Sequence, residues 1–258
     1  IVVLYTFPYY YYLTVLPSAA AIYIYQKNYD IRLRTYLAIF LVLFFTILVR
    51  PPITPGILCL CLIIALLRNN FRNWVIFASM VVIAALFFIN NQLIFGPWHT
   101  IYIGVGAYPN GFDILLTDQS TNDFYNKLFS DNKASYDNID YMDRINLLKS
   151  EVFRLIYLDP ILYAQNAFKN ILHLYGLGYS DDYYWFRYVS MLVGTAFLLL
   201  LIYKKLYFHL IVIFTLNAGY VLYFPPIPMY MAGTYLLLIH GWLEILSKTS
   251  NNFSSNER

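Results

Sequence analysis

The sequence predicts an all-α integral membrane protein with about seven transmembrane helices and one large, mainly helical, extracytoplasmic loop. Three observations carry this prediction. The chain is 60% hydrophobic and 12% charged, whereas soluble domains contain about 45–50% apolar and about 25% charged residues. Apolar segments flank a single long polar run, residues 91–184. Basic residues occur in every second connection between apolar segments, as repeated crossing of a bilayer requires.

Each apolar segment is expected to form a helix, because about 20 apolar residues cross a bilayer. The segments are residues 2–25, 36–49, 53–67, 74–89, 184–203, 206–224 and 229–246. The second and third are short, so they either rely on snorkelling Arg32, Arg34 and Arg68 or form a re-entrant hairpin. The 27 Tyr and 20 Phe residues suit helices whose ends lie at membrane interfaces.

The placement of Lys and Arg predicts the orientation in the membrane. The basic connections contain Lys27, Arg32, Arg34, Arg68, Arg72, Lys204, Lys205, Lys248 and Arg258. The long run has eleven acidic and six basic residues, a formal charge of −5. We therefore expect residues 91–184 outside the cytoplasm and the C-terminus inside.

This topology divides the chain into four parts. Residues 1–90 are expected to hold four transmembrane helices, residues 91–184 the extracytoplasmic loop, residues 185–247 three further helices and residues 248–258 a cytoplasmic tail.

Within the loop, apolar spacing predicts helices over residues 141–157 and 160–175, separated at Asp159-Pro160. Asp140 is expected to cap the first helix and Asp159 the second. Two amphipathic helices near a bilayer can lie on its surface or pack on the membrane bundle, and their few cations favour packing on the bundle.

The charge pattern excludes nucleic acid as a partner, because the net charge is only +3 and the basic residues are dispersed. Cys59 and Cys61 point to different sides of a helix, so we expect core residues rather than a disulfide or metal site. His173, His209 and His240 stand alone in the sequence and receive no role. No cofactor is predicted, and no other pattern supports a divalent cation.

The segment from Trp98 to Gly111 contains three glycines and Pro109. Such a segment either brings its backbone close to a ligand or is a structured connector that leaves a membrane helix. His99 either donates to a phosphate and shuttles protons or completes an aromatic belt.

The acids of the loop have simple structural explanations. A helix from Ser120 would place Asp123 near its N-terminus, and Asp113 and Asp118 would be solvated carboxylates. Asp181-Asp182 either caps the helix that follows or contributes to a cation site beside a pyrophosphate.

Two arginines stand at the predicted outer ends of helices. Arg50 precedes Pro51-Pro52 and has no partner nearby in sequence. Its side chain either snorkels to the membrane surface, or its guanidinium group binds a lipid-linked phosphate through two parallel hydrogen bonds. Arg187 can serve the same purpose, or pair with Asp182 or Asp113.

Several motifs occur together in an order that resembles one protein family. They are Arg50-Pro51 at the start of an apolar segment, Trp98-His99 with Tyr102, Gly104, Gly106, Tyr108 and Asn110, then Asp118, Asp159-Pro160, and the terminal run from Tyr223 to Tyr230. This pattern resembles the C-terminal half of bacterial GT-C type membrane glycosyltransferases, relatives of the protein O-mannosyltransferases and the lipid A aminoarabinose transferase. The resemblance implies transfer of a sugar from a polyprenyl-phosphate donor to an extracytoplasmic acceptor.

The resemblance and the charges predict a substrate-binding group composed of Arg50, Trp98, His99, Tyr102, Asn110, Asp118 and Arg187. The cations would bind the donor phosphate, and Asp118 would face the acceptor or be structural. In these enzymes the catalytic Asp or Glu lies in an outward loop between the first two helices. The only acid before Asp113 is Asp30, on the predicted inner side, so the sequence assigns no catalytic residue.

Two other classes of protein compete with this interpretation. One is a non-catalytic membrane subunit whose loop 91–184 binds a partner protein. The other is a transporter, which the absence of charged residues at the midpoint of any predicted span disfavours.

Overall fold

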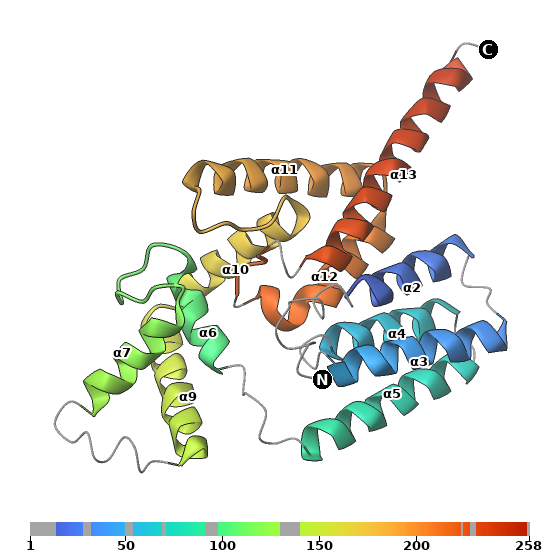
Figure 1. The fold of residues 1–258 in the computed structure, drawn as a ribbon. Coiled ribbons are helices and arrows are strands. Elements are labelled where there is room, and N and C mark those ends of the chain that lie inside the picture. The colour runs from blue at the N-terminus through green and yellow to red at the C-terminus, as the bar shows by residue number, and fades with distance from the viewer. Residues whose placement is uncertain are drawn as a thin grey trace.

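The computed structural model describes residues 14–27, 32–49, 54–68, 71–90, 98–129, 140–222, 224–227 and 231–256. These residues form α-helices and one short 3-10 helix, without a β-strand among them, which confirms the all-α class (Figure 1). The helices are α2 (Val15–Gln26), α3 (Leu33–Val49), α4 (Thr54–Arg68), α5 (Phe71–Asn90), α6 (Trp98–Gly104), η3 (Val105–Ala107), α7 (Asp118–Leu128), α9 (Tyr141–Leu158), α10 (Pro160–Tyr175), α11 (Tyr184–Tyr203), α12 (Tyr207–Val221) and α13 (Ala232–Asn256).

The part of the polar run before α10 has a hydrophobic core distinct from those of the apolar helices. Helices α2 and α4 contribute to one core with α10–α13, whereas α6, α7 and α9 surround another that contains Tyr102, Tyr125 and Val152. Figure 1 shows α6, α7 and α9 to one side of the apolar helices, with α10 leading back to them. We call residues 98–129 and 140–158 the inserted module.

The predicted break between the two helices of the polar run is confirmed. Helix α9 ends at Leu158 and α10 begins at Pro160. The Asp159 carboxylate accepts a hydrogen bond from the Leu162 N–H at 2.9 Å. Pro160 occupies the first helical position, where a backbone N–H would have no partner within the helix, so its missing N–H costs no hydrogen bond. Asp140 stands at the N-cap of α9, but its side chain makes no capping bond, so that part of the prediction is wrong.

Helix α10 packs directly on α11, which agrees with the expectation that the loop helices pack on the apolar helices. A Cβ atom at Gly194 would lie 1.9 Å from the Leu172 carbonyl oxygen, and one at Gly176 would lie 2.0 Å from the Ser190 carbonyl oxygen. Only glycine permits this backbone contact. Helix α9 differs from the expectation, because it packs mainly on α6.

The two ends of the described chain meet through α2 and α13. Gly233 N–H donates to Thr14 Oγ1 at 3.1 Å across 219 residues, and a Cβ atom at Gly233 would lie 2.1 Å from the Thr14 carbonyl oxygen. The same pair of helices is joined again at Tyr25 and Gln26, described below.

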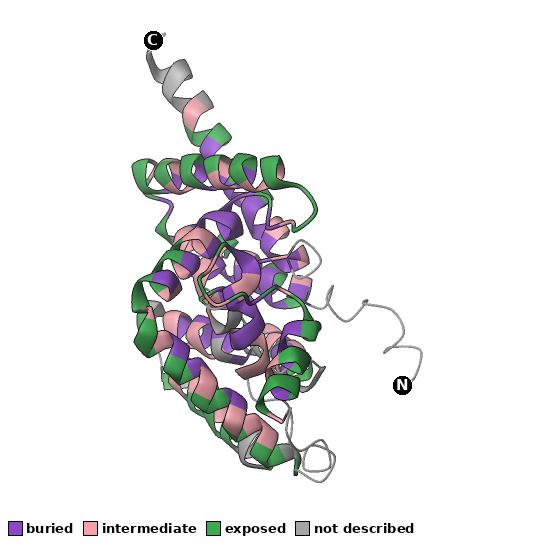
Figure 2. Cartoon of the chain, turned by 90° about the vertical axis from the view of Figure 1, so that its left-hand side faces the viewer, coloured by how far each residue is buried: buried purple, intermediate pink, exposed green. Residues whose placement is uncertain are grey.

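Apolar side chains remain exposed along the helices. Buried residues gather in the interior and exposed ones follow the outer faces (Figure 2). On α11, Leu192 is 71% and Leu199 62% exposed. By length and composition, α11 is long and apolar enough to cross a membrane, and α3, α4, α5 and α12 contain shorter apolar stretches. The described parts of all seven predicted segments are therefore largely helical, and their crossing of a membrane stays a prediction.

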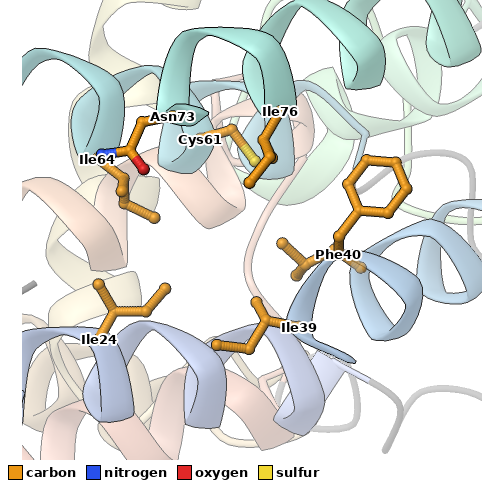
Figure 3. Close-up of a pocket in the computed structure, with 8 residues that line it drawn as sticks. Ile24, Ile39, Phe40, Cys61, Ile64, Asn73 and Ile76 are labelled. Carbon is orange, nitrogen blue, oxygen red and sulfur yellow. The ribbon is translucent and has the colours of Figure 1, made fainter. Parts of the chain in front are cut away.

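A small apolar cavity of about 20 Å³ lies where α2, α3, α4 and α5 meet (Figure 3). Its lining consists of Ile24, Ile39, Phe40, Leu43, Cys61, Ile64, Asn73 and Ile76. A volume of this size holds about one water molecule. It is too small to enclose a lipid chain.

Candidate functional site

His99 and Asp118, two of the predicted substrate-binding residues, are in direct contact. His99 Nε2 lies 2.9 Å from Asp118 Oδ1, and His99 Nδ1 lies 3.0 Å from Thr121 Oγ1. The contact forms because the start of α6 packs against the first turn of α7. The side chains are 41% and 84% exposed, respectively. This pair can offer both a proton donor and a carboxylate to a ligand on the surface of the inserted module.

Trp98 and Tyr102 stabilise the inserted module. The Trp98 ring lies 5.4 Å from that of Phe153, with Lys149 Nζ 5.5 Å from the Trp98 centroid. Tyr102 is buried beside Phe124, and its burial raises its pKa to about 12. Tyr102 is therefore a core residue, and Trp98 covers the side of α9.

Two interpretations of the segment Trp98–Gly111 were open, a ligand-binding backbone and a structured connector, and much of the segment is helical. Residues 98–104 form α6 and residues 105–107 form η3. A Cβ atom at Gly106 would lie 2.2 Å from the Leu115 carbonyl carbon. The close approach that the glycine permits is thus to the chain's own backbone, and the connector interpretation is the one that agrees with the structure.

Asn110 holds the turn that follows. Its side-chain amide donates to the carbonyl oxygens of Tyr108 at 3.1 Å and Ile114 at 2.9 Å. Its Oδ1 accepts from the N–H groups of Phe112 at 3.1 Å and Ile114 at 3.3 Å. This amide is fully used within the loop, which supports a structural role in place of the predicted substrate contact.

A buried polar group, the tyrosine cluster, joins η3 to α10 and to the segment before α11. It contains Tyr108, Asn170, His173 and Tyr179. Tyr108 donates to Asn170 Oδ1 at 2.8 Å, and Tyr179 donates to the Ala107 carbonyl. The His173 ring stacks with Tyr108 and meets Tyr179 edge-on. Burial raises the pKa of both tyrosines and lowers that of His173 to about 4, so all three rings are neutral near pH 7.

Arg187 lies over the tyrosine cluster with its guanidinium already engaged. It forms an ion pair with Asp181, donates from Nε to the Ser180 carbonyl at 2.7 Å, and lies 4.5 Å from the Tyr179 ring centroid. A weaker contact, at 3.5 Å, joins Nη1 to the Ala107 carbonyl. Arg187 therefore does approach the segment Trp98–Asn110, as predicted, and its ionic partner is Asp181 instead of Asp182 or Asp113.

Other predictions for the acids are wrong. Helix α7 begins at Asp118, which places Asp123 inside the helix, where it accepts from Gln119 Nε2 at 2.7 Å. The N-cap of α11 is Tyr183, without a side-chain capping bond, so Asp181-Asp182 does not cap this helix. Arg50 lies outside the described residues.

His209 and His240 are not solitary, contrary to the sequence interpretation. His209 Nε2 and His240 Nδ1 lie 2.7 Å apart, with Glu244 close by. The four-residue spacing of His240 and Glu244 is a sequence signal for one helix face. His209 is 31 residues away on another helix, and no local pattern links it to them.

The chain matches no protein-family model, no curated protein and no solved structure.

Proposed function

We propose that this chain is a membrane glycosyltransferase of the GT-C type, or the C-terminal part of one, which transfers a sugar from a polyprenyl-phosphate donor to an extracytoplasmic acceptor. One observation carries most weight: an acidic, separately packed module is inserted between helices that expose apolar side chains. Large apolar side chains on outer helix faces suit contact with lipid. The module then lies at one membrane surface, where a lipid-linked substrate presents its head group.

The proposed donor site centres on Arg187. Its partner Asp181 is 63% exposed, whereas the Arg187 side chain is only 11% exposed. A donor phosphate can displace this exposed carboxylate and take over the ion pair, while the Ser180 carbonyl and the Tyr179 ring keep the guanidinium in place. Arg50 is proposed as the second cation, and membrane lipids as the surroundings of the polyprenyl chain.

Lys169 provides a further positive charge at this position. Its Nζ lies 4.7 Å from the Tyr108 ring centroid, and no carboxylate lies within 4 Å of it in the described part of the chain. Asp118 with His99 belongs to the acceptor side in this proposal, because a carboxylate beside the donor phosphate would repel it. The catalytic base, which must deprotonate the acceptor, is not assigned.

The test is binding of a polyprenyl phosphate to the purified full chain in lipid nanodiscs, with the uncharged polyprenol as reference ligand. Asp181→Asn should tighten phosphate binding, because it removes the competing charge. Arg187→Ala should weaken it by about one to two decades, since a charge-assisted hydrogen bond contributes roughly 1.5–3 kcal/mol. Arg187→Lys should recover only part of this loss.

Arg154→Ala is the matched control, because Arg154 forms a comparable ion pair with Glu151 on α9. It should leave phosphate binding unchanged. Equal affinity in wild type, Asp181→Asn and Arg187→Ala would refute the donor site. Binding of polyprenol as tight as that of the phosphate would refute head-group recognition.

A second candidate function, a membrane subunit that binds a partner protein, is favoured by one observation. The corner of α9 and α10 exposes Tyr157 (86%), Ile161 (66%) and Phe168 (60%). Apolar patches of this kind mark contacts with proteins or membranes. Replacing these three residues by Ser should abolish co-purification of a partner if the subunit interpretation holds, and should leave donor binding intact if the enzyme interpretation holds.

A further inference from the structure

Two helices, α12 and α13, bring two histidines and a glutamate together. His209 comes from α12, and His240 and Glu244 from successive turns of α13. One ligand atom from each lies within 4.8 Å of the other two. Helix α2 closes the group, since Gln26 Nε2 lies 3.1 Å from His240 Nε2 and Tyr25 donates to Glu244 Oε2 at 3.3 Å. This group is remote in sequence from every residue proposed above to bind the donor.

The hydrogen bonds of the two rings leave one polar atom unsatisfied. If His240 Nε2 accepts from Gln26, then His240 Nδ1 carries the proton and His209 Nε2 accepts it. His209 is fully buried, and its Nδ1 has no hydrogen-bond partner among the described residues. The two atoms that face each other, His209 Nε2 and His240 Nδ1, share a single proton. Without that proton, each nitrogen could offer a lone pair to a metal ion.

The charge of Glu244 also lacks compensation. Within the described part of the chain, no Lys, Arg or His nitrogen lies within 4.0 Å of its carboxylate. A partly buried carboxylate is costly unless a cation pairs with it. Two imidazole nitrogens and one carboxylate oxygen form the donor set that zinc and neighbouring divalent metals prefer, and three protein ligands leave a fourth position for water.

We propose that His209, His240 and Glu244 bind one divalent transition-metal ion, with zinc as the best match to the nitrogen and oxygen ligands. The ion takes the place of the proton between His209 Nε2 and His240 Nδ1, and this proton moves to His240 Nε2, the other ring nitrogen. Tetrahedral zinc requires the two nitrogens to separate from 2.7 Å to roughly 3.3 Å, a small ring rotation. Tyr25 continues to donate to Glu244, and the Gln26 amide turns so that its oxygen accepts from His240 Nε2–H, as second partners of metal ligands commonly do.

Gly241 makes room for this arrangement. A Cβ atom at this position would lie 3.3 Å from His209 Cδ2 and 2.9 Å from the Phe197 ring. The missing side chain allows the His209 ring to lie against α13 between His240 and Glu244. A bound ion would thus connect α12 to α13 directly, and α2 to both through hydrogen bonds.

The experiment uses the full chain, purified in detergent through a tag without histidine and freed of metal with a chelator. Zinc bound per chain is measured after dialysis against micromolar free zinc, and cobalt is added separately because its visible absorption reports tetrahedral nitrogen and oxygen ligands. We expect one zinc per chain, an intense cobalt band, and a loss of affinity of about 10- to 100-fold or more in His240→Gln and in Glu244→Gln.

Two variants separate metal binding from folding. Glu244→Gln keeps an acceptor for Tyr25, so its melting temperature without metal should equal that of wild type while the zinc-induced rise disappears. His99→Gln is the matched control, because His99 also lies beside a carboxylate, and it should keep the bound zinc. Substoichiometric zinc in wild type, an octahedral-type cobalt spectrum, or unchanged zinc in Glu244→Gln would each overturn the proposal.

Discussion

His173 should make the folded protein less stable as the pH falls from 8 to 5. Its pKa is lowered to about 4, mainly by burial; the Gly178 backbone opposes part of this shift, and the Arg187 charge adds to it. In the unfolded chain a histidine has a pKa of about 6.5. Between these two values the unfolded state binds more protons than the folded state, so stability decreases as the pH falls.

The two pKa values determine the magnitude. At pH 5 the linkage relation gives a loss of about 2 kcal/mol relative to pH 8, and below pH 4 the loss levels off near 3 kcal/mol. The neutral tyrosines Tyr108 and Tyr179 face the ring, and Lys169 lies over Tyr108. Among the described residues, no carboxylate pairs with the His173 imidazole to stabilise its charge.

The assay is the free energy of unfolding in mixed micelles at pH 8, 6.5 and 5, for wild type and for His173→Gln. Carboxylates contribute equally to both proteins, so the difference between them isolates the imidazole. We expect His173→Gln to lose less stability on acidification by about 2 kcal/mol. If stability fell equally with pH in the two proteins, the buried ring would not be neutral. A steeper loss in the variant would mean that His173 stabilises the protein at low pH, the opposite of the prediction.

Three further predictions test the fold and its orientation. Asn110→Ala should destabilise the protein by about 2–3 kcal/mol, measured by thermal unfolding, because it leaves loop N–H and carbonyl groups unpaired; an unchanged melting temperature with weaker donor binding would instead make Asn110 a ligand residue. Gly194→Ala should cost about 1–3 kcal/mol by forcing α10 away from α11, and an increase in melting temperature would contradict that contact. In a chain without Cys59 and Cys61, a single cysteine at position 133 should react with an impermeant reagent added outside and one at position 251 should not; the opposite result would invert the orientation.

Local patterns were sufficient to predict the helices and failed for contacts between them. Apolar spacing and the Asp159-Pro160 cap predicted α9 and α10 to within one residue, because both signals act within a few residues of the chain. The glycines of residues 98–111 left a ligand loop and a structured connector both open, and only tertiary packing shows that Gly104 lies in α6 and Gly106 in η3.

The polar contacts depend on distant pairs that no local rule selects. Tyr108 and Asn170 are 62 residues apart, and His209 and His240 are 31 residues apart. Arg187 was correctly placed near the segment Trp98–Asn110, but its partner Asp181 could not be chosen among the neighbouring acids from spacing alone. Only the geometry of the turn before α11 distinguishes Asp181 from Asp182.

The contact between α2 and α13 has a consequence for how the protein is made. Helices α10 and α11 adjoin in sequence, so they can pair as soon as both have left the ribosome. The Gly233 to Thr14 contact spans 219 residues and must wait until α13 has been synthesised. Until then α2 exposes the surface that α13 later covers, including Thr14 and Ser18. During this interval α2 can pack only on helices that are synthesised earlier, such as α3 and α12.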